Sequence, residues 1–265
     1  MVNNGLSRTG IRLISLRVED FFMLMHSHPL YRIYFGDARD EIFTSDYLNF
    51  PQTQNILDKE PFSKLKKIMG IDHLIFLHQV HGTKGLIIEY KNQAEKIRPF
   101  SVDGDYIITN VKDVGIGVVV ADCLPIILFD KRNQVLAIVH AGWRSSVEHI
   151  AIKAVDKMQK TFGTKIEDIR VTFGPSAKVC CYKVGEDFLE QLQDFEFVDR
   201  VVQRRSDGLY FDLPMFNMIL LKSLGIKNDA FKFEYNDCTV CDESFYSHRR
   251  NGDQAGRNMV VASLT

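Results

Sequence analysis

The chain has 265 residues, of which 45% are hydrophobic and 25% are charged, and its formal net charge is −1. This composition is typical of a globular protein, and the charge excludes a surface built for nucleic acid or for an anionic membrane. No apolar run approaches the roughly 20 residues of a transmembrane helix, and the N-terminal segment lacks a secretory signal pattern. We therefore expect a cytoplasmic protein of one domain, residues 1–265, with five reduced cysteines.

Two segments in the first hundred residues have a clear pattern. Residues 61–69 carry apolar side chains at helical spacing, and Gly70 after them suits the C-terminal cap of a helix. Residues 73–80 form an apolar run that predicts a strand continuing into His81. Because side chains alternate along a strand, this register turns His81 and His78 to opposite faces.

Residues 114–144 are the most apolar part of the chain and predict three strands. The first, 114–121, has the composition of a strand buried on both faces, and Asp122 and Cys123 follow it directly. The runs 126–129 and 135–139 come next, and the second run ends on His140. A thiol and an imidazole at strand ends indicate a place for chemistry, although a buried Cys and a core His are also common.

Two helices are predicted in the second half of the chain. Ser145, with Glu148 three residues later, has the spacing of a capping box, and an apolar stripe follows as far as Gly163. Asp212 and Pro214 suit the start of a second helix that ends at Gly225. Strands and helices mix without strict βαβ alternation, so we predict an α/β or mixed α+β domain with mixed sheets.

Three residues at the ends of predicted strands are candidate metal ligands: His81, Cys123 and His140. Imidazole and thiolate are good zinc ligands, and three protein ligands with an open fourth position are typical of a catalytic zinc site. The spacing alone leaves open whether the three residues converge.

The other four cysteines are the adjacent pair Cys180 and Cys181 and the CxxC pair Cys238 and Cys241. Structural zinc sites use the CxxC spacing twice, and an adjacent pair departs from that spacing. The pattern therefore favours thiols in loops over a zinc knuckle.

Three arginines are candidate ligands for an anion, because a guanidinium binds phosphate or carboxylate through two N–H groups. Arg249 and Arg250 stand beside Gly252, and this context alone favours an exposed basic turn. Arg144 is better placed, near a predicted helix start where backbone N–H groups also attract anions.

Several enzyme signatures are missing from the sequence. It contains no GxGxxG, GxxxxGK[ST], HExxH or GxSxG, and no His is followed two residues later by Glu. These absences argue against dinucleotide-binding, P-loop, zincin, α/β-hydrolase and cytidine-deaminase sites. A multicopper oxidase is not expected either, because it needs several paired His clusters, and the eight His residues form one HxH, at His26 and His28.

Six stretches occur in order within residues 73–265: HQVHG (78–82), DGDYIITN (103–110), ADCLPIILFD (121–130), HAGWR (140–144), GPSAKVCCYKVG (174–185) and CTVCDESFYSHRRNG (238–252). Together these stretches resemble the laccase-domain (polyphenol oxidase) family. The N-terminal third diverges, with residues 32–43 in place of the family's usual glycine-pair segment. The resemblance implies a four-layer α/β/β/α arrangement.

The resemblance also implies a function. Family members are described as zinc-dependent purine nucleoside phosphorylases that also deaminate adenosine, and others are named peptidoglycan editing factors. The family's zinc ligands fall here on His81, Cys123 and His140, and the last two would be catalytic. The implied partners are small molecules: phosphate, for which Arg144, Arg249 and Arg250 are candidates, and adenosine, inosine or methylthioadenosine.

Two other functions remain open at this stage. One is a Cys–His hydrolase of peptidoglycan precursors, with Cys123 as nucleophile and His140 as base. The other is a nucleoside-binding module without catalysis. The sequence does not determine the oligomeric state.

Overall fold

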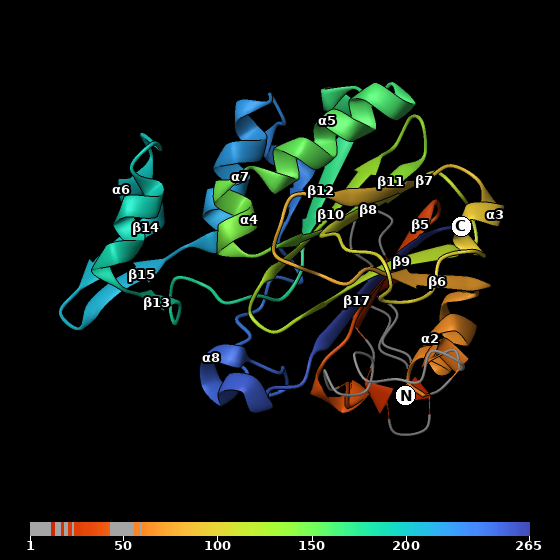
Figure 1. Cartoon of the computed structure of the whole chain (residues 1–265), viewed down its shortest axis with the longest axis horizontal. Helices are drawn as coiled ribbons and strands as arrows, with labels where there is room; N and C mark the ends of the chain where they lie inside the picture. The colour runs from red at the N-terminus through yellow and green to blue at the C-terminus, as the bar shows by residue number, and fades with distance from the viewer. Residues whose placement is uncertain (1–11, 14–16, 19–20, 23, 43–55, 59) are drawn as a thin grey trace.

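The computed structural model describes residues 12–13, 17–18, 21–22, 24–42, 56–58 and 60–265, and two six-stranded sheets form its centre (Figure 1). The first sheet has the order β1 (Arg12–Leu13), β4 (Leu24–His28), β5 (Tyr31–Phe35), β17 (Asn258–Leu264), β9 (Val114–Val120) and β6 (His73–Phe76). The second has the order β16 (Phe231–Lys232), β12 (Ile169–Phe173), β10 (Leu124–Asp130), β11 (Val135–Ala141), β8 (Tyr106–Thr109) and β7 (Gly85–Ile88).

Both sheets mix strand directions, which confirms the predicted α+β class with mixed sheets. Most neighbouring strands are antiparallel, but β6 runs parallel to β9, β7 to β8 and β16 to β12. All residues of β9, β10 and β11 are buried. The three apolar runs of the sequence are therefore strands covered on both faces, which the composition predicted for the first run, 114–121.

The sheets share one core, because residues of alternate strand positions meet between them. Ile116 and Val260 of the first sheet belong to the same apolar cluster as Ile127, Phe129 and Leu136 of the second. The opposite face of the second sheet packs on α5 (Ile150–Phe162) and α7 (Leu213–Ser223). The opposite face of the first sheet packs on α2 (Phe62–Met69).

Smaller elements surround this centre. A three-stranded sheet of β13 (Lys183–Val184), β15 (Gly208–Phe211) and β14 (Val202–Arg205) lies to one side with α6 (Val198–Val201), as Figure 1 shows. The strands β2 (Arg17–Val18) and β3 (Phe21–Phe22) pair with each other. The remaining short helices are α3 (Lys91–Ala94), α4 (Trp143–Val147), α8 (His248–Asn251) and 3-10 turns at Ala38–Asp40, Ile56–Asp58, Ile166–Asp168, Glu186–Leu192, Asn228–Ala230 and Gly252–Gln254.

Most predicted helix ends are confirmed. Gly70 and Gly163 adopt left-handed conformations as C-terminal caps of α2 and α5. The Asp212 side chain accepts a hydrogen bond from the backbone N–H of Met215 at the start of α7. These caps satisfy backbone groups that a helix end would leave unpaired.

The prediction that Ser145 caps a helix is wrong. Ser145 lies inside α4, where its hydroxyl donates to the carbonyl of Gly142, 3.2 Å away, and Gly142 is the N-terminal cap. The expected continuous helix is interrupted at His149, which has a φ of 63° and precedes α5. No helix in the described ranges is long and apolar enough to cross a membrane.

The N-terminal segment 32–43, which diverges from the family pattern, contributes most of β5 and the 3-10 turn at Ala38–Asp40. Its last residue, 43, lies outside the described residues. The pairing of β5 with both β4 and β17 makes this segment part of the first sheet.

Candidate active site

His81, Cys123 and His140 converge at one edge of the two sheets. Their metal-capable atoms all lie within 4.8 Å of one another. Sγ of Cys123 is 3.8 Å from Nε2 of His81, and the two imidazole rings are 4.8 Å apart at an interplanar angle of 71°. Cys123 stands in the turn between β9 and β10, and His140 lies on β11. The structure thus brings together the three residues that the sequence placed at strand ends.

The segment that carries His81 is a loop, so the prediction of a strand over 73–80 is wrong beyond Phe76. The side chain of Gln79 pairs with the backbone of β9 instead: its Nε2 donates to the carbonyl of Val119, and its Oε1 accepts from the N–H of Val119, both at 2.8 Å. Beyond the end of β6, the side-chain amide of Gln79 makes the two hydrogen bonds to β9 that a backbone N–H and carbonyl would otherwise make. His81 itself has a φ of 58°, a conformation that few residues other than glycine adopt.

The expectation that His78 and His81 lie on opposite faces of one strand is wrong, because the strand ends at Phe76, but the two side chains make different contacts. Nδ1 of His78 lies 2.8 Å from the exposed carboxylate of Asp103, and the His78 imidazole is half-exposed. In the described residues, His78 belongs to neither group of side chains that could hold a metal.

Asp105 holds the cluster together and was missed in the sequence. Its buried carboxylate accepts hydrogen bonds from the backbone N–H of His81 at 2.9 Å and of Gly82 at 2.7 Å. Its Oδ1 also lies 2.8 Å from Nδ1 of His140. Burial alone would raise the pKa of Asp105, but the hydrogen bond and charge of His140 lower it. An ionised Asp105 keeps the proton of His140 on Nδ1 and leaves Nε2 for a ligand or a proton.

The surroundings of Cys123 and His140 favour a thiolate on Cys123 and a protonated imidazole on His140. Burial alone would raise the pKa of the Cys123 thiol, but the adjacent His140 and His81 lower it to about 6. Burial would also lower the pKa of His140, but the charge of Cys123 and the hydrogen bond that His140 donates to Asp105 raise it to about 9. A metal ligand set needs the Cys123 thiolate but neutral imidazoles, so binding of a metal here would release the Nε2 proton of His140.

The space at Gly142 also fits a metal. A Cβ atom added to Gly142 would lie 3.2 Å from Sγ of Cys123 and 3.0 Å from Cδ2 of His81. The φ of Gly142 is −74°, so glycine is required here by space and not by backbone conformation. Two imidazoles and one thiolate suit zinc, a metal of borderline softness.

The cluster opens into a cavity of about 730 Å³, a volume typical of small-molecule sites. Two cationic side chains stack on aromatic rings at its wall. The guanidinium of Arg144 lies 4.4 Å from the ring of Trp143, and that of Arg249 lies 4.5 Å from the ring of Tyr182. The residues lining the cavity are Leu77, His78, Gln79, His81, Phe100, Val119, Ala121, Asp122, Cys123, His140, Trp143, Arg144, Tyr182, His248, Arg249 and Arg257.

Arg250 is not among these lining residues, although the sequence grouped it with Arg249. Its guanidinium donates to the backbone carbonyls of Thr239 at 2.9 Å and Val240 at 3.1 Å, and to that of Phe245. These contacts use the guanidinium of Arg250 elsewhere, so it is not placed to bind an anion in the cavity. Arg257, which the sequence did not single out, lines the cavity instead.

A second group of metal-capable side chains was not expected. The sulfur atoms of Cys180, Cys181, Cys238 and Cys241 lie within 4.8 Å of one another. The sequence spacing did not predict this convergence: the fold brings an adjacent pair and a CxxC pair together across about sixty residues of sequence.

Comparison with known proteins connects this geometry with a family. Residues 58–265 match the family described as multi-copper polyphenol oxidoreductase laccase. A purine nucleoside phosphorylase of Clostridium acetobutylicum is 30% identical over 246 residues, which cover 91% of this chain and 95% of that protein. A purine nucleoside phosphorylase of Aquifex aeolicus is 33% identical over 208 residues, covering 77% and 91%.

Two further similarities concern activity and fold. Adenosine deaminase RL5, from an unknown prokaryotic organism, is 31% identical over 212 residues, which cover 77% of this chain and 80% of that protein. The crystal structure of Bacillus licheniformis hypothetical protein YfiH aligns with a TM-score of 0.75 at 23% identity, covering 97% of this chain and all of that one (100%). At that identity, the structural match establishes the fold alone.

Proposed function

Because the chain belongs to the polyphenol oxidoreductase laccase family, with residues 58–265 matching it, we propose that it is a zinc-dependent enzyme of purine nucleosides. The proposed reactions are phosphorolysis of inosine and adenosine and deamination of adenosine. Relatives named purine nucleoside phosphorylase and adenosine deaminase support this choice. The observation that carries it is the convergence of His81, Cys123 and His140 in a cavity that also presents Arg144 and Arg249.

His81, Cys123 and His140 would hold the zinc ion, as three protein ligands do in catalytic zinc sites. Bound zinc supplies a Lewis acid that polarises a substrate group or a water molecule. The described residues contain two groups of three or more metal-capable side chains, and one of them consists of thiols alone. Neither is the set of paired His clusters that multicopper oxidation needs.

The other side chains of the cavity have separate tasks in this proposal. Asp105 fixes the His140 ring and its Nδ1 proton, which keeps Nε2 directed to the cluster. The guanidinium groups of Arg144 and Arg249 neutralise the phosphate dianion. The rings of Trp143 and Tyr182 supply apolar surface for the flat purine.

In phosphorolysis, a phosphate oxygen forms a bond to C1′ of the ribose as the bond from C1′ to N9 of the purine breaks. The purine leaves with the bonding electrons and takes up a proton. In deamination, the oxygen of water replaces the amino group at C6, and ammonia leaves. Both reactions act on the same nucleoside, so one cavity serves both if the anion and the water approach from different sides.

The test is incubation of zinc-loaded protein with inosine and phosphate, and separately with adenosine. We expect hypoxanthine and ribose 1-phosphate from the first mixture and ammonia from the second. Protein treated with a chelator is the matched control and should lose both activities. Zinc-loaded, folded protein that turns over neither nucleoside would contradict the proposal.

One observation favours a second candidate, a Cys–His hydrolase of peptidoglycan precursors. Cys123, His140 and Asp105 form a chain of thiol, imidazole and carboxylate, which is the arrangement of a thiol nucleophile, its base and the group that orients the base. The candidates differ in their response to zinc. Hydrolysis that rises on zinc removal and ends on alkylation of Cys123 would favour the second.

A further inference from the structure

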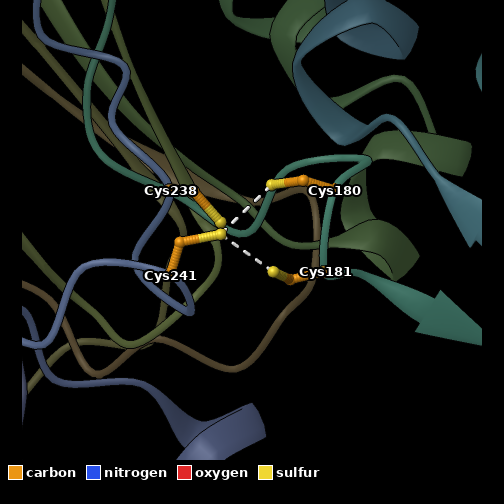
Figure 2. A group of neighbouring side chains, drawn as sticks. All are labelled: Cys180, Cys181, Cys238 and Cys241. Carbon is orange, nitrogen blue, oxygen red and sulfur yellow. Dashed lines mark hydrogen bonds between the residues drawn. The ribbon is translucent and has the colours of Figure 1, made fainter.

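The four cysteines outside the cavity wall form a compact group between two loops. Figure 2 shows their side chains pointing toward one another, with Cys180 and Cys181 on one loop and Cys238 and Cys241 on the other. Sγ of Cys241 lies 2.9 Å from Sγ of Cys181 and 3.4 Å from Sγ of Cys180. All four sulfur atoms are within 4.8 Å of one another.

These separations match a tetrahedral ligand set. With a zinc–sulfur bond of about 2.3 Å, the sulfur atoms of a regular tetrahedron are about 3.8 Å apart. The separations of 2.9 Å and 3.4 Å are below that value and all four atoms lie within 4.8 Å, so small side-chain rotations are enough to close the shell. Four sulfur ligands select zinc or an iron–sulfur cluster rather than magnesium or calcium.

The two loops are joined by their own backbone, so the thiols are gathered by the fold. The N–H of Ser176 donates to the carbonyl of Asp237 at 3.0 Å, and the N–H of Thr239 donates back to the carbonyl of Ser176 at 3.1 Å. Lys178 adds a hydrogen bond from Nζ to the carbonyl of Asn236 at 2.8 Å. A ligand set held in place before the metal arrives loses less chain entropy on binding.

Cationic side chains surround the group. Arg250 donates to the carbonyls of Thr239 and Val240, the two residues between the cysteines of the CxxC. Arg205 donates to the carbonyl of Cys180 at 3.1 Å and to that of Val179 at 2.9 Å. A zinc ion with four thiolates has a net charge of −2, and two guanidinium groups beside it offset that charge.

The four cysteines are also more exposed to solvent than core residues are. Cys180 and Cys241 are exposed, and Cys181 and Cys238 are half-buried. Unpaired cysteines in proteins are usually buried among apolar side chains. Four thiols that meet at a partly exposed surface need another reason to be together.

We propose that Cys180, Cys181, Cys238 and Cys241 bind a structural zinc ion, at a site separate from the cavity and independent of the proposed activity. Four protein ligands fill a zinc shell and leave no open position, which is the rule for structural sites. The ion links the loop that leads to Tyr182 with the loop that leads to α8 and Arg249. Both residues line the cavity, so this site fixes the distance between two parts of its wall.

The test uses the full-length protein expressed with zinc and purified under reducing conditions without chelators. The Cys123→Ser variant removes one ligand of the cavity cluster, so any zinc that remains reports on the four-cysteine group. We expect one zinc per chain in this variant by elemental analysis. We also expect an X-ray absorption spectrum with four sulfur neighbours at about 2.3 Å and no nitrogen neighbour.

Removing a ligand of the proposed site gives the complementary result. Cys241→Ser should lose one equivalent of zinc relative to the parent chain, and Cys241→Ser with Cys123→Ser should hold none. Ser244→Ala, an exposed change in the same loop, is the matched control and should keep the zinc content of the parent.

Three results would overturn the proposal. The first is a folded Cys123→Ser protein without metal, and the second is iron in place of zinc at the sulfur site. The third is a disulfide among the four cysteines in reduced, zinc-supplied protein, which intact-mass measurement detects as the loss of two hydrogen atoms. Because the spectrum of Cys123→Ser is taken with all four cysteines present, the proposal stays testable even if Cys241→Ser fails to fold.

Discussion

The backbone N–H of Arg249 lies 2.6 Å from Oδ2 of Asp122, the residue that directly precedes Cys123. The other carboxylate oxygen of Asp122 accepts the hydroxyl of Thr239 at 2.7 Å. Asp122 has a φ of 87°, so the turn before Cys123 is held in a backbone conformation that residues other than glycine rarely adopt. One carboxylate thus connects the candidate zinc ligand, the cationic wall and the CxxC loop, and a displacement of any one of them acts on the others.

Arg249→Ala should weaken the use of phosphate more than deamination. A guanidinium contact to a dianion contributes about 1.5–3 kcal/mol, so we expect phosphorolysis at limiting phosphate to fall roughly ten- to a hundredfold. Deamination uses water and should fall less, and zinc content should stay unchanged. Initial rates at varied phosphate give the measurement. Arg204→Ala, in an exposed ion pair with Glu186, is the control. Equal loss of both reactions in Arg249→Ala would mean that Arg249 holds the nucleoside.

Asp105→Asn should lower zinc affinity at the cavity cluster without removing a ligand. The carboxylate accepts the Nδ1 proton of His140, and loss of such a supporting group usually costs about 10- to 100-fold in metal affinity. Competition with a coloured chelator measures the change. Asp103→Asn is the matched control because Asp103 is exposed and contacts His78 instead. Similar zinc affinity in the two variants would contradict the positioning role of Asp105.

His81→Ala and His78→Ala should behave differently. His81 contributes Nε2 to the cluster, and we expect its replacement to release the zinc bound there. His78 lines the cavity but contacts Asp103, so His78→Ala should keep the metal and change nucleoside affinity at most. Zinc content per chain, measured for both purified variants, decides. Equal zinc loss in the two would contradict the different roles assigned to His81 and His78.

Gly142→Ala should disturb the cluster through crowding alone. The added methyl group would lie 3.0–3.2 Å from His81 and Cys123, which is tighter than ordinary contacts allow. We expect weaker zinc binding with little change in thermal stability. Gly82→Ala is the control, because its methyl group would meet its neighbours at 3.6 Å and 3.7 Å. If Gly142→Ala binds zinc as tightly as Gly82→Ala does, the open space beside Gly142 is not needed for zinc binding.

Stability should depend on pH through Asp40, a buried carboxyl group that belongs to neither metal-capable cluster. Burial raises the pKa of Asp40 to about 7, although the hydroxyl of Tyr34 donates to it at 2.6 Å. In the unfolded chain the group titrates near 3.8, so the folded state holds the proton more tightly. The free energy of unfolding should therefore fall as pH rises from about 4 to about 7, by at most about 1.4 kcal/mol per pH unit, and level off above that range.

Urea unfolding at about pH 5 and about pH 7 measures this slope. Asp40→Asn cannot ionise and should lack the contribution, so its free energy of unfolding should depend less on pH than that of the parent. Asp253→Asn, at an exposed position, should keep the slope of the parent. A parent protein equally stable at both pH values, or a slope unchanged in Asp40→Asn, would be the contrary result.

The parts of the site that the sequence predicted are those that depend on local pattern. The apolar runs of β9, β10 and β11 identify buried strands, and Cys123 and His140 stand at their ends. The parts that it missed depend on tertiary pairing. Asp105 is in a polar turn in the sequence, and only the approach of β11 gives its carboxylate a histidine to hold.

The cysteine group shows the same limit. Sequence spacing tests whether one loop can supply two ligands, but Cys180 and Cys238 meet because Ser176 pairs with Cys238 across the two loops. The role of Gln79 could not be predicted from the local sequence either, because its side chain makes hydrogen bonds in the first sheet that backbone groups normally make. Resemblance to a family pointed to His81, Cys123 and His140 but not to these contacts.

The position of β17 bears on how the protein is made. Residues 258–264 lie between β5 and β9 and pair with both, so they join the early and middle parts of the chain in the first sheet. A ribosome that has synthesised residues 1–257 has produced β5 and β9 but not the strand between them. Each presents an unpaired edge until that strand arrives. During translation these edges must be kept from pairing with other chains, and a stall before residue 258 would leave an aggregation-prone nascent polypeptide.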